Sequence, residues 1–358
     1  MIRFIDSLTC SSPNSYMDMK LNEFWDTLNP KKKDGNYAQK SICIRLSNLL
    51  SKYKYDVVNN NYECKATHNR HIYYLEYLQD NNYMNLRNLI LSPPEELYTR
   101  IEETLNILLQ DDISERNKDT WKVVGLGKLL SEQVFKYDSF RSSNKCNKFY
   151  KNLGIDKKHC LYCGDYKLDI VTTSDNQGNK KILTREDKML FDLDHFYLKS
   201  KYPFLSLSFY NLIPCCGICN SRYRGNLEFH TASHINPYLE SFDENYIFEF
   251  DKFEVTRAIQ KSNPVINELK LVIKSTSSRP HDMTARDLSL QDRYIHQLSS
   301  INSIFKEVVQ NGNRQWNEIE EIICGYEYYR IPIDRKKILD INMAKYKMDF
   351  VDMIKKLL

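Results

Sequence analysis

The chain has 358 residues, of which 42% are hydrophobic and 27% charged, and its formal net charge is only +4. These values are typical of a globular protein of two or three domains and exclude a chain that binds nucleic acid through its overall charge. The segment MIRFIDSLTC lacks the apolar core of a signal peptide, and no run of about 18 apolar residues occurs. We therefore expect a cytoplasmic protein without a membrane span, whose 10 cysteines are thiols or metal ligands.

The first 120 residues are predicted to be mostly helical. Helical patterns cover about 42–53, 92–110 and, further on, 126–137. In the second of these an apolar stripe falls on one helix face, formed by Leu97, Ile101, Leu105 and Leu108. Such a stripe packs into the protein's own core or docks a partner, and both interpretations stay open for residues 1–120.

A basic run, RSSNKCNKFYKNLGIDKKHC, covers residues 141–160. It contains six Lys or Arg and one Asp, which gives a local excess of +5. A run of this kind is either a solvated face or a surface that contacts phosphate groups.

Two Cys-x-x-Cys pairs, Cys160/Cys163 and Cys216/Cys219, follow this run. Each pair can present two thiolates to one tetrahedral ion, so the four sulfurs predict a closed structural zinc site. Cys215 is not expected to be a ligand, because it cannot easily point the same way as its neighbour, and His159 is the less favoured alternative. The 52 residues between the pairs exceed the ~15–20 of a compact zinc ribbon, so other chemistry is inserted there.

The insertion contains FDLDHFYLKSKYP. Its alternation predicts a strand in which Asp192 and Asp194 share one side and His195 faces the other. An apolar strand is expected at about 209–214, and a helix is expected to begin within 216–224. Two strands and a helix would form one unit around a cation.

The order of Asp194, His195, Asn211 and Asn220 resembles the HNH nuclease motif, whose fold is the ββα-metal unit. The resemblance covers about 121–250 and extends to a subgroup with flanking zinc knuckles, through KSKYP, YNLIP, CxxCN and the later Asn-Pro-Tyr at 236–238. Two positions depart from that pattern: Leu198 stands where the subgroup has proline, and the first knuckle reads CLYCGD.

The resemblance implies that His195 is the general base, that Asn211 orients its loop, and that Asp194 and Asn220 hold Mg²⁺ or Mn²⁺. The residues alone point the same way, since histidine titrates near neutral pH and carboxylate and amide oxygens suit a hard cation. Candidate phosphate contacts, or simply exposed charges, are Lys199, Lys201, Arg222 and Arg224.

Residues 251–358 are expected to add short strands and then helices. The predicted strands lie near 246–250 and at 268–274, where Leu269, Leu271 and Ile273 alternate with outward positions. The expected fold class is therefore α+β, with a central zinc-stabilised nuclease domain between mostly helical regions.

The leading functional prediction is an HNH endonuclease that cuts DNA. The resemblance extends to nucleases of Septu-type or retron-linked anti-phage defence, which implies an ATPase partner; no GxxxxGK[ST] loop occurs here, so any ATPase is another subunit. The alternatives are a ribonuclease toxin and an inert zinc-stabilised protein that binds nucleic acid.

Overall fold

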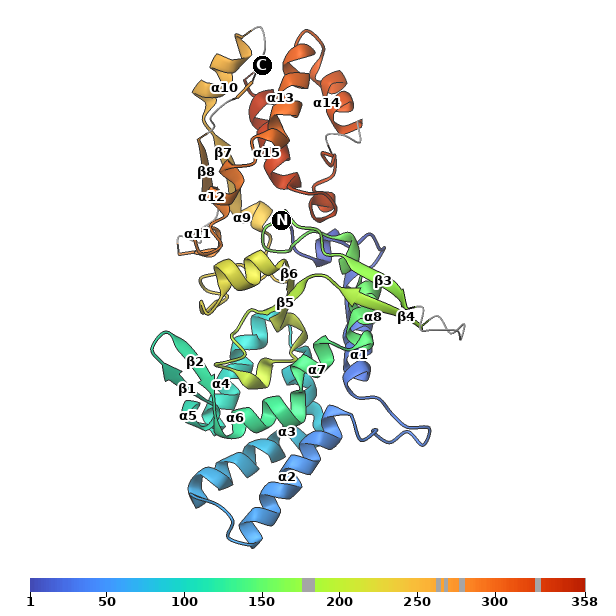
Figure 1. Cartoon of the computed structure of the whole chain (residues 1–358), viewed down its shortest axis with the longest axis vertical. Helices are drawn as coiled ribbons and strands as arrows, with labels where there is room; N and C mark the ends of the chain where they lie inside the picture. Colours follow the sequence, from blue (N-terminus) through green and yellow to red (C-terminus); the bar gives the residue numbers. More distant parts are fainter. Residues whose placement is uncertain (176–183, 262–264, 267–269, 277–280, 326–329, 358) are drawn as a thin grey trace.

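The computed structural model describes residues 1–175, 184–261, 265–266, 270–276, 281–325 and 330–357. The molecule is elongated in Figure 1: α2 (Ile42–Val58) lies at one end, α13 (Ser299–Gln310) at the other, and the hairpin of β5 (Asp192–His195) and β6 (Leu212–Cys215) between them. Helices dominate, and the described strands form small two-stranded antiparallel sheets. The α+β class predicted from the sequence is confirmed at this level.

The N-terminal region is built from amphipathic helices. They are α1 (Pro13–Leu28), α2, α3 (Lys65–Leu91) and α4 (Leu97–Ile107). α2 begins where the Ser41 hydroxyl accepts a hydrogen bond from the Ile44 N–H, which satisfies a free amide of the first turn. Leu97, Ile101 and Leu108 are buried in the common core, so the predicted stripe packs inside this chain.

A hairpin that the sequence did not predict closes this region. β1 (Ser114–Asn117) pairs with β2 (Thr120–Val123) after the short helix α5 (Gln110–Ile113). The predicted helix over 126–137 is divided: α6 (Gly125–Leu129) continues into a helical segment, Leu130–Phe135, and then Lys136 adopts a left-handed conformation. That residue turns the chain into α7 (Tyr137–Arg141), which is followed by α8 (Asn144–Leu153).

The central region holds the hairpin expected from the sequence. In β5 and β6, Asp192 pairs with Cys215 and His195 with Leu212. The second strand begins at Leu212 rather than near 209, because Phe209–Asn211 forms a single helical turn. A helical segment, Ile218–Arg224, then contacts β5. A further hairpin, β3 (Ile170–Asp175) with β4 (Thr184–Met189), precedes β5.

The C-terminal region contains the strand predicted at 246–250, observed as β7 (Tyr246–Phe250), paired with β8 (Leu271–Ser275). Leu269, which was expected in the second strand, lies outside the described residues. The helices here are α9 (Phe242–Asn245), α10 (Lys252–Ile259), α11 (Thr284–Asp287), α12 (Leu290–Ile295), α13, α14 (Trp316–Gly325) and α15 (Ala344–Lys355).

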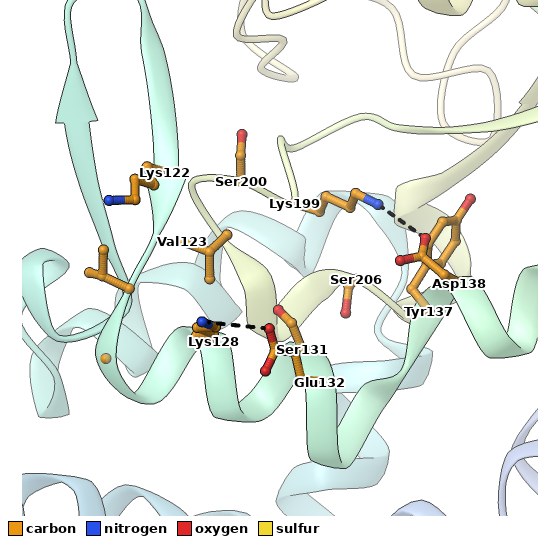
Figure 2. Close-up of a pocket in the computed structure, with 12 residues that line it drawn as sticks. Lys122, Val123, Lys128, Ser131, Glu132, Tyr137, Asp138, Lys199, Ser200 and Ser206 are labelled. Atoms are coloured by element: carbon orange, nitrogen blue, oxygen red, sulfur yellow. Dashed lines mark ion pairs between the residues drawn. The ribbon is translucent and has the colours of Figure 1, made fainter.

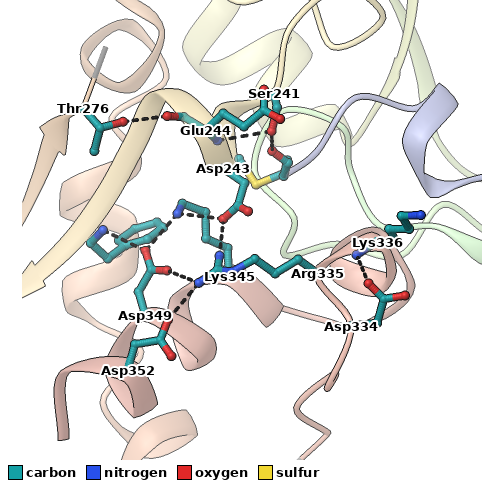
Figure 3. Close-up of polar contacts among 12 residues, drawn as sticks. Ser241, Asp243, Glu244, Thr276, Asp334, Arg335, Lys336, Lys345, Asp349 and Asp352 are labelled. Atoms are coloured by element: carbon teal, nitrogen blue, oxygen red, sulfur yellow. Dashed lines mark hydrogen bonds and ion pairs between the residues drawn. The ribbon is translucent and has the colours of Figure 1, made fainter. Parts of the chain in front are cut away.

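Buried charges attach α15 to the rest of this region (Figure 3). Lys345 lies 2.9 Å from both Asp243 of α9 and Asp349 of its own helix. Asp349 also accepts a hydrogen bond from the Phe248 N–H of β7, at 2.9 Å. α15 is thus joined to the consecutive elements α9 and β7 through two carboxylates and one ammonium group.

The region 121–250 is not separate from its flanks. Lys201 O accepts hydrogen bonds from Gln110 and Ser114, and the His159 N–H donates to Leu339 O. Buried apolar side chains from both flanks and the centre belong to one continuous core. Within the described part of the chain, no helix is both long and apolar enough to cross a membrane.

Candidate active site and metal centre

The four predicted cysteines come together. The sulfur atoms of Cys160, Cys163, Cys216 and Cys219 all lie within 4.8 Å of one another, and all four residues are buried. One pair comes from the turn before β3, and the other lies directly after β6, with Cys219 in the helical segment Ile218–Arg224. The group therefore joins the two ends of the 52-residue insertion. The structure confirms that these side chains form a buried group that could hold a metal ion such as zinc.

Donors surround the sulfurs in the manner expected for thiolates. The Cys216 N–H donates to Cys160 Sγ at 3.3 Å, and the Cys219 N–H donates to Cys216 Sγ at 3.4 Å. Arg293 of α12 places Nη1 3.3 Å from Cys219 Sγ. Burial would lower the pKa of Arg293, but the charges of Cys219 and Cys163 raise it above its ordinary value. The backbone N–H groups and Arg293 therefore compensate the negative charge that thiolate sulfurs would carry.

Cys215, which was not expected to be a ligand, and His159, the less favoured alternative, both lie outside the group. Cys215 belongs to β6, is buried, and is not in the group; burial raises the pKa of its thiol well above the ordinary value. His159 has its Nδ1 3.2 Å from Leu339 O, so its ring is used in a contact with the C-terminal region. Both placements agree with the expected ligand set.

His195 ends β5 and is almost fully buried. Its Nε2 lies 3.0 Å from Ser206 O, and because a carbonyl oxygen only accepts, Nε2 carries the proton and Nδ1 is left as the basic nitrogen. The Tyr137 ring packs edge-on against the imidazole, with centroids 4.5 Å apart. Burial, assisted by the charge of Lys199, lowers the pKa of His195 to about 3, so the ring is neutral at physiological pH and does not titrate near neutral pH as expected from the sequence.

Asn211 holds the loop between the strands. Its Oδ1 accepts from the Tyr197 N–H at 2.7 Å, and its Nδ2 donates to Tyr197 O at 3.0 Å and to Leu205 O at 3.2 Å. The side chain is fully buried, and these bonds satisfy both ends of its amide. Asn211 therefore fixes the loop that brings Ser206 to His195.

Asn220 and Asp192 bond to each other, whereas Asp194 has other partners. Asn220 Nδ2 donates to Asp192 Oδ2 at 3.1 Å. Asp194 Oδ2 accepts from the Tyr162 hydroxyl at 2.8 Å and lies 3.4 Å from Arg224 Nε. Burial raises the pKa of Asp194, while Arg224 and Tyr162 oppose that shift. The expected neighbours Asp194 and Asn220 thus share one face of the hairpin but do not bond directly to each other.

Arg224 corrects one of the predicted phosphate contacts. Its side chain is fully buried, its Nη2 donates to His195 O at 2.8 Å and to Phe196 O at 3.0 Å, and its guanidinium lies over the Phe229 ring. Because these internal contacts hold the Arg224 guanidinium inside the protein, it cannot contact a phosphate group at the surface. Arg224 is buried because it follows Asn220 by about one helical turn and therefore also faces β5.

The other three basic candidates differ in availability. Lys199 is exposed, 3.6 Å from Asp138, and Arg222 is also exposed. Lys201 is engaged: it pairs with Glu228 at 2.5 Å and lies over the Trp121 ring, 4.7 Å from its centroid. Lys199 and Arg222 therefore remain as surface cations near the hairpin.

Figure 2 shows a cleft beside Tyr137 and Ser206, with a volume of about 540 Å³. Tyr137 and Ser206, the two contacts of His195, line it together with Lys122, Lys128 and Lys199. Each lysine has an acidic neighbour, at 3.2 to 4.0 Å, but the side chains are exposed and such pairs contribute only ~0–1 kcal/mol. The ammonium groups are thus free to exchange these partners for another anion.

Sequence reasoning missed several members of this site. Tyr162, which contacts Asp194, could have been considered from the sequence, because it lies between Cys160 and Cys163 of the first Cys-x-x-Cys pair. Lys122 and Lys128 come from the unpredicted hairpin and the helix after it. No nearby sequence pattern indicated Arg293, because it lies 74 positions after Cys219, the last cysteine of the group.

Comparison of the chain with protein-family models, with curated proteins and with solved structures finds no match.

Proposed function

We propose that this chain is an HNH-type endonuclease that hydrolyses phosphodiester bonds of DNA. The observation that carries the proposal is the hairpin unit: strand β5 ends at a buried neutral histidine, Asn211 braces the intervening loop, and the helical segment after β6 presents Asn220 to Asp192. A cleft with three lysines opens at the histidine's two contacts, Tyr137 and Ser206.

His195 is the general base in this proposal. The Ser206 carbonyl fixes the proton on Nε2, so Nδ1 can accept a proton from an attacking water. Asn211 acts through the loop: its three hydrogen bonds hold the segment that contains Ser206 and thereby orient the imidazole. Lys122, Lys128 and Lys199 hold the phosphate backbone across the cleft.

The oxygen donors of Asp192, Asp194 and Asn220 fit a hard divalent cation. Carboxylate and amide oxygens are what Mg²⁺ or Mn²⁺ prefers, and Asp194 and Asn220, with Asp192 next to Asn220, supply them on one face of β5. When bound, the cation supplies charge stabilisation at the leaving 3′ oxygen. The four-cysteine group, compact and compensated by Arg293, fits structural zinc.

The central test is cleavage of plasmid DNA with Mg²⁺ or Mn²⁺ by zinc-loaded protein. We expect His195→Ala to lower the rate by about 10²- to 10⁴-fold while zinc content and circular dichroism stay unchanged. The matched control is His296→Ala, which replaces an exposed histidine and should cleave like the original protein.

The alternatives give different results in the same assay. Cleavage of RNA but not DNA would identify a ribonuclease, and binding without cleavage of either would identify an inert nucleic-acid-binding protein. Full activity of His195→Ala would remove His195 from the mechanism. The role as effector of anti-phage defence with an ATPase partner stays a prediction from the resemblance, and co-purification from the native host tests it.

A further inference from the structure

A second pocket, of about 390 Å³, is built on the same segment as the cleft. Phe135, Ser139 and Phe140 line this pocket, whereas Ser131, Tyr137 and Asp138 line the cleft. The pocket is completed by the end of α1, the beginning of α2 and the beginning of α8. Its location makes it distinct from the proposed active site, although α7 contributes to both.

The lining of this pocket is cationic without compensation. It contains four basic side chains and no acidic one: Lys40, Arg45, Lys136 and Lys145. Over the part of the chain that the structure describes, none of these four forms an ion pair. Each lysine of the cleft, in contrast, has an acidic neighbour. Like charges gathered in a concave site repel one another unless an anion lies between them.

Arg45 is the least exposed of the four basic side chains. Its Nε is buried and has no hydrogen-bond partner among the described residues. The Arg45 charge therefore has no partner among the described residues, and it adds to the uncompensated positive charge of the pocket. Burial also lowers the pKa of Arg45, as expected for a cation without a counter-charge.

The remaining lining adds to the preference for an anion and limits its size. α8 begins at the pocket with Ser143 as its cap, so the positive end of the helix dipole is directed there. Phe135 and Phe140 provide apolar wall, and the volume is that of a small-molecule site rather than an open track for a polymer.

We propose that this pocket binds a small phosphate ester of nucleotide size, with Arg45, Lys136 and Lys145 around the phosphate groups. Arginine contributes directed donors and the lysines contribute charge. The proposal does not rest on nuclease activity, because binding is measured without cleavage.

The test is calorimetric titration of the full chain with inorganic pyrophosphate and with ADP. We expect saturable binding of both at one site, and we expect Arg45→Gln and Lys145→Gln each to weaken it by about 10- to 100-fold. Lys145 is exposed, so its variant removes charge without disturbing the core. The matched control is Lys148→Gln, an exposed lysine of the same helix that does not line the pocket, and it should leave the affinity unchanged.

Three results would overturn the proposal. Lys148→Gln could cost as much as Lys145→Gln, which would show a general charge effect. Wild-type protein could bind no better than Arg45→Gln. In the third result, neither pyrophosphate nor ADP binds, but Arg45→Gln and Lys145→Gln weaken the binding of duplex DNA. That result would assign these cations to a nucleic-acid surface instead.

Discussion

Arg224 Nε lies 3.4 Å from Asp194 Oδ2, and both side chains are buried. The arginine therefore neutralises the carboxylate that directly precedes the proposed general base. Because Arg224 also donates to His195 O and Phe196 O, it fixes the point where β5 ends. A cation bound to Asp194 would share that carboxylate with a permanent positive charge.

Replacing Arg224 should destabilise the fold. Arg224→Gln leaves Asp194 buried without its charge partner and frees two backbone carbonyls, so the free energy of unfolding should fall by about 3–5 kcal/mol. Arg222→Gln, two positions earlier and exposed, should change it by less than ~0.5 kcal/mol. Urea unfolding followed by circular dichroism measures both. Equal stability of the two variants, with DNA binding lost only in Arg224→Gln, would instead restore Arg224 as a phosphate contact.

Zinc content should depend on the four cysteines of the buried group and not on their neighbour Cys215. We expect Ser variants of Cys160, Cys163, Cys216 and Cys219 to lose stoichiometric zinc, because a closed site needs every thiolate. Cys215→Ser changes a buried residue beside the group and should retain the metal. Elemental analysis after dialysis against a chelator distinguishes the variants. Zinc lost from Cys215→Ser but kept in Cys216→Ser would contradict this ligand set.

The buried charges of Figure 3 offer a matched pair of carboxylates. The Asp349 side chain is 3% exposed and accepts from Lys345 and the Phe248 N–H, whereas that of Asp352 is 57% exposed; both contact Arg335. Asp349→Asn should lower the free energy of unfolding by about 1.5–3 kcal/mol, since it weakens charged hydrogen bonds inside the protein. Asp352→Asn should cost less than ~1 kcal/mol. Thermal and urea unfolding measure the difference, and similar losses would mean that Asp349 is solvated.

Stability should fall in mild acid, partly through His71. Burial lowers the pKa of His71, although Asp112, whose Oδ1 lies 3.4 Å from Nε2, opposes the shift; Arg70 and His68 add to the lowering. Below its unfolded-state pKa of about 6.5, the unfolded chain binds a proton that the folded chain does not. The stabilisation is therefore present above about pH 6.5 and is lost as the pH falls toward the folded-state pKa.

The pH effect can be assigned with one substitution. In His71→Gln the decline of the free energy of unfolding between about pH 7 and 5 should be shallower than in the original protein. The control His296→Gln removes an exposed histidine and should keep the original slope. Unfolding by urea at several pH values gives the slopes. An unchanged slope in His71→Gln would mean that other groups carry the acid sensitivity.

The features that the sequence predicts well are local ones. Cys160/Cys163 and Cys216/Cys219 are each defined by a spacing of three, and the structure joins the two pairs. The alternation around Asp192 and Asp194 fixes a strand whose two faces follow from the period of two. Tyr246–Phe250 alternates in the same way and is also a strand.

The features that the sequence does not predict depend on distant contacts. β1 is polar and mostly exposed, and β2 has only two apolar residues, Trp121 and Val123, in alternate positions, which is too short a pattern to indicate a strand. Arg293 approaches the cysteines only after α12 packs against them. The partner of Asp194 could have been inferred, because Arg224 follows Asn220 by four positions and a helical turn brings both to β5.

The contact of α12 with the cysteine group also bears on how such a protein can evolve. Arg293 compensates Cys219, and Tyr294 donates a hydrogen bond to Cys163 O, so residues far beyond the hairpin complete the surroundings of the sulfurs. A segment cut at 121–250 would leave these behind, along with the contacts of Lys201 O to Gln110 and Ser114. If recombination moved the hairpin unit alone onto a new scaffold, the unit would lose these contacts, whereas a transfer that included its flanks would keep them.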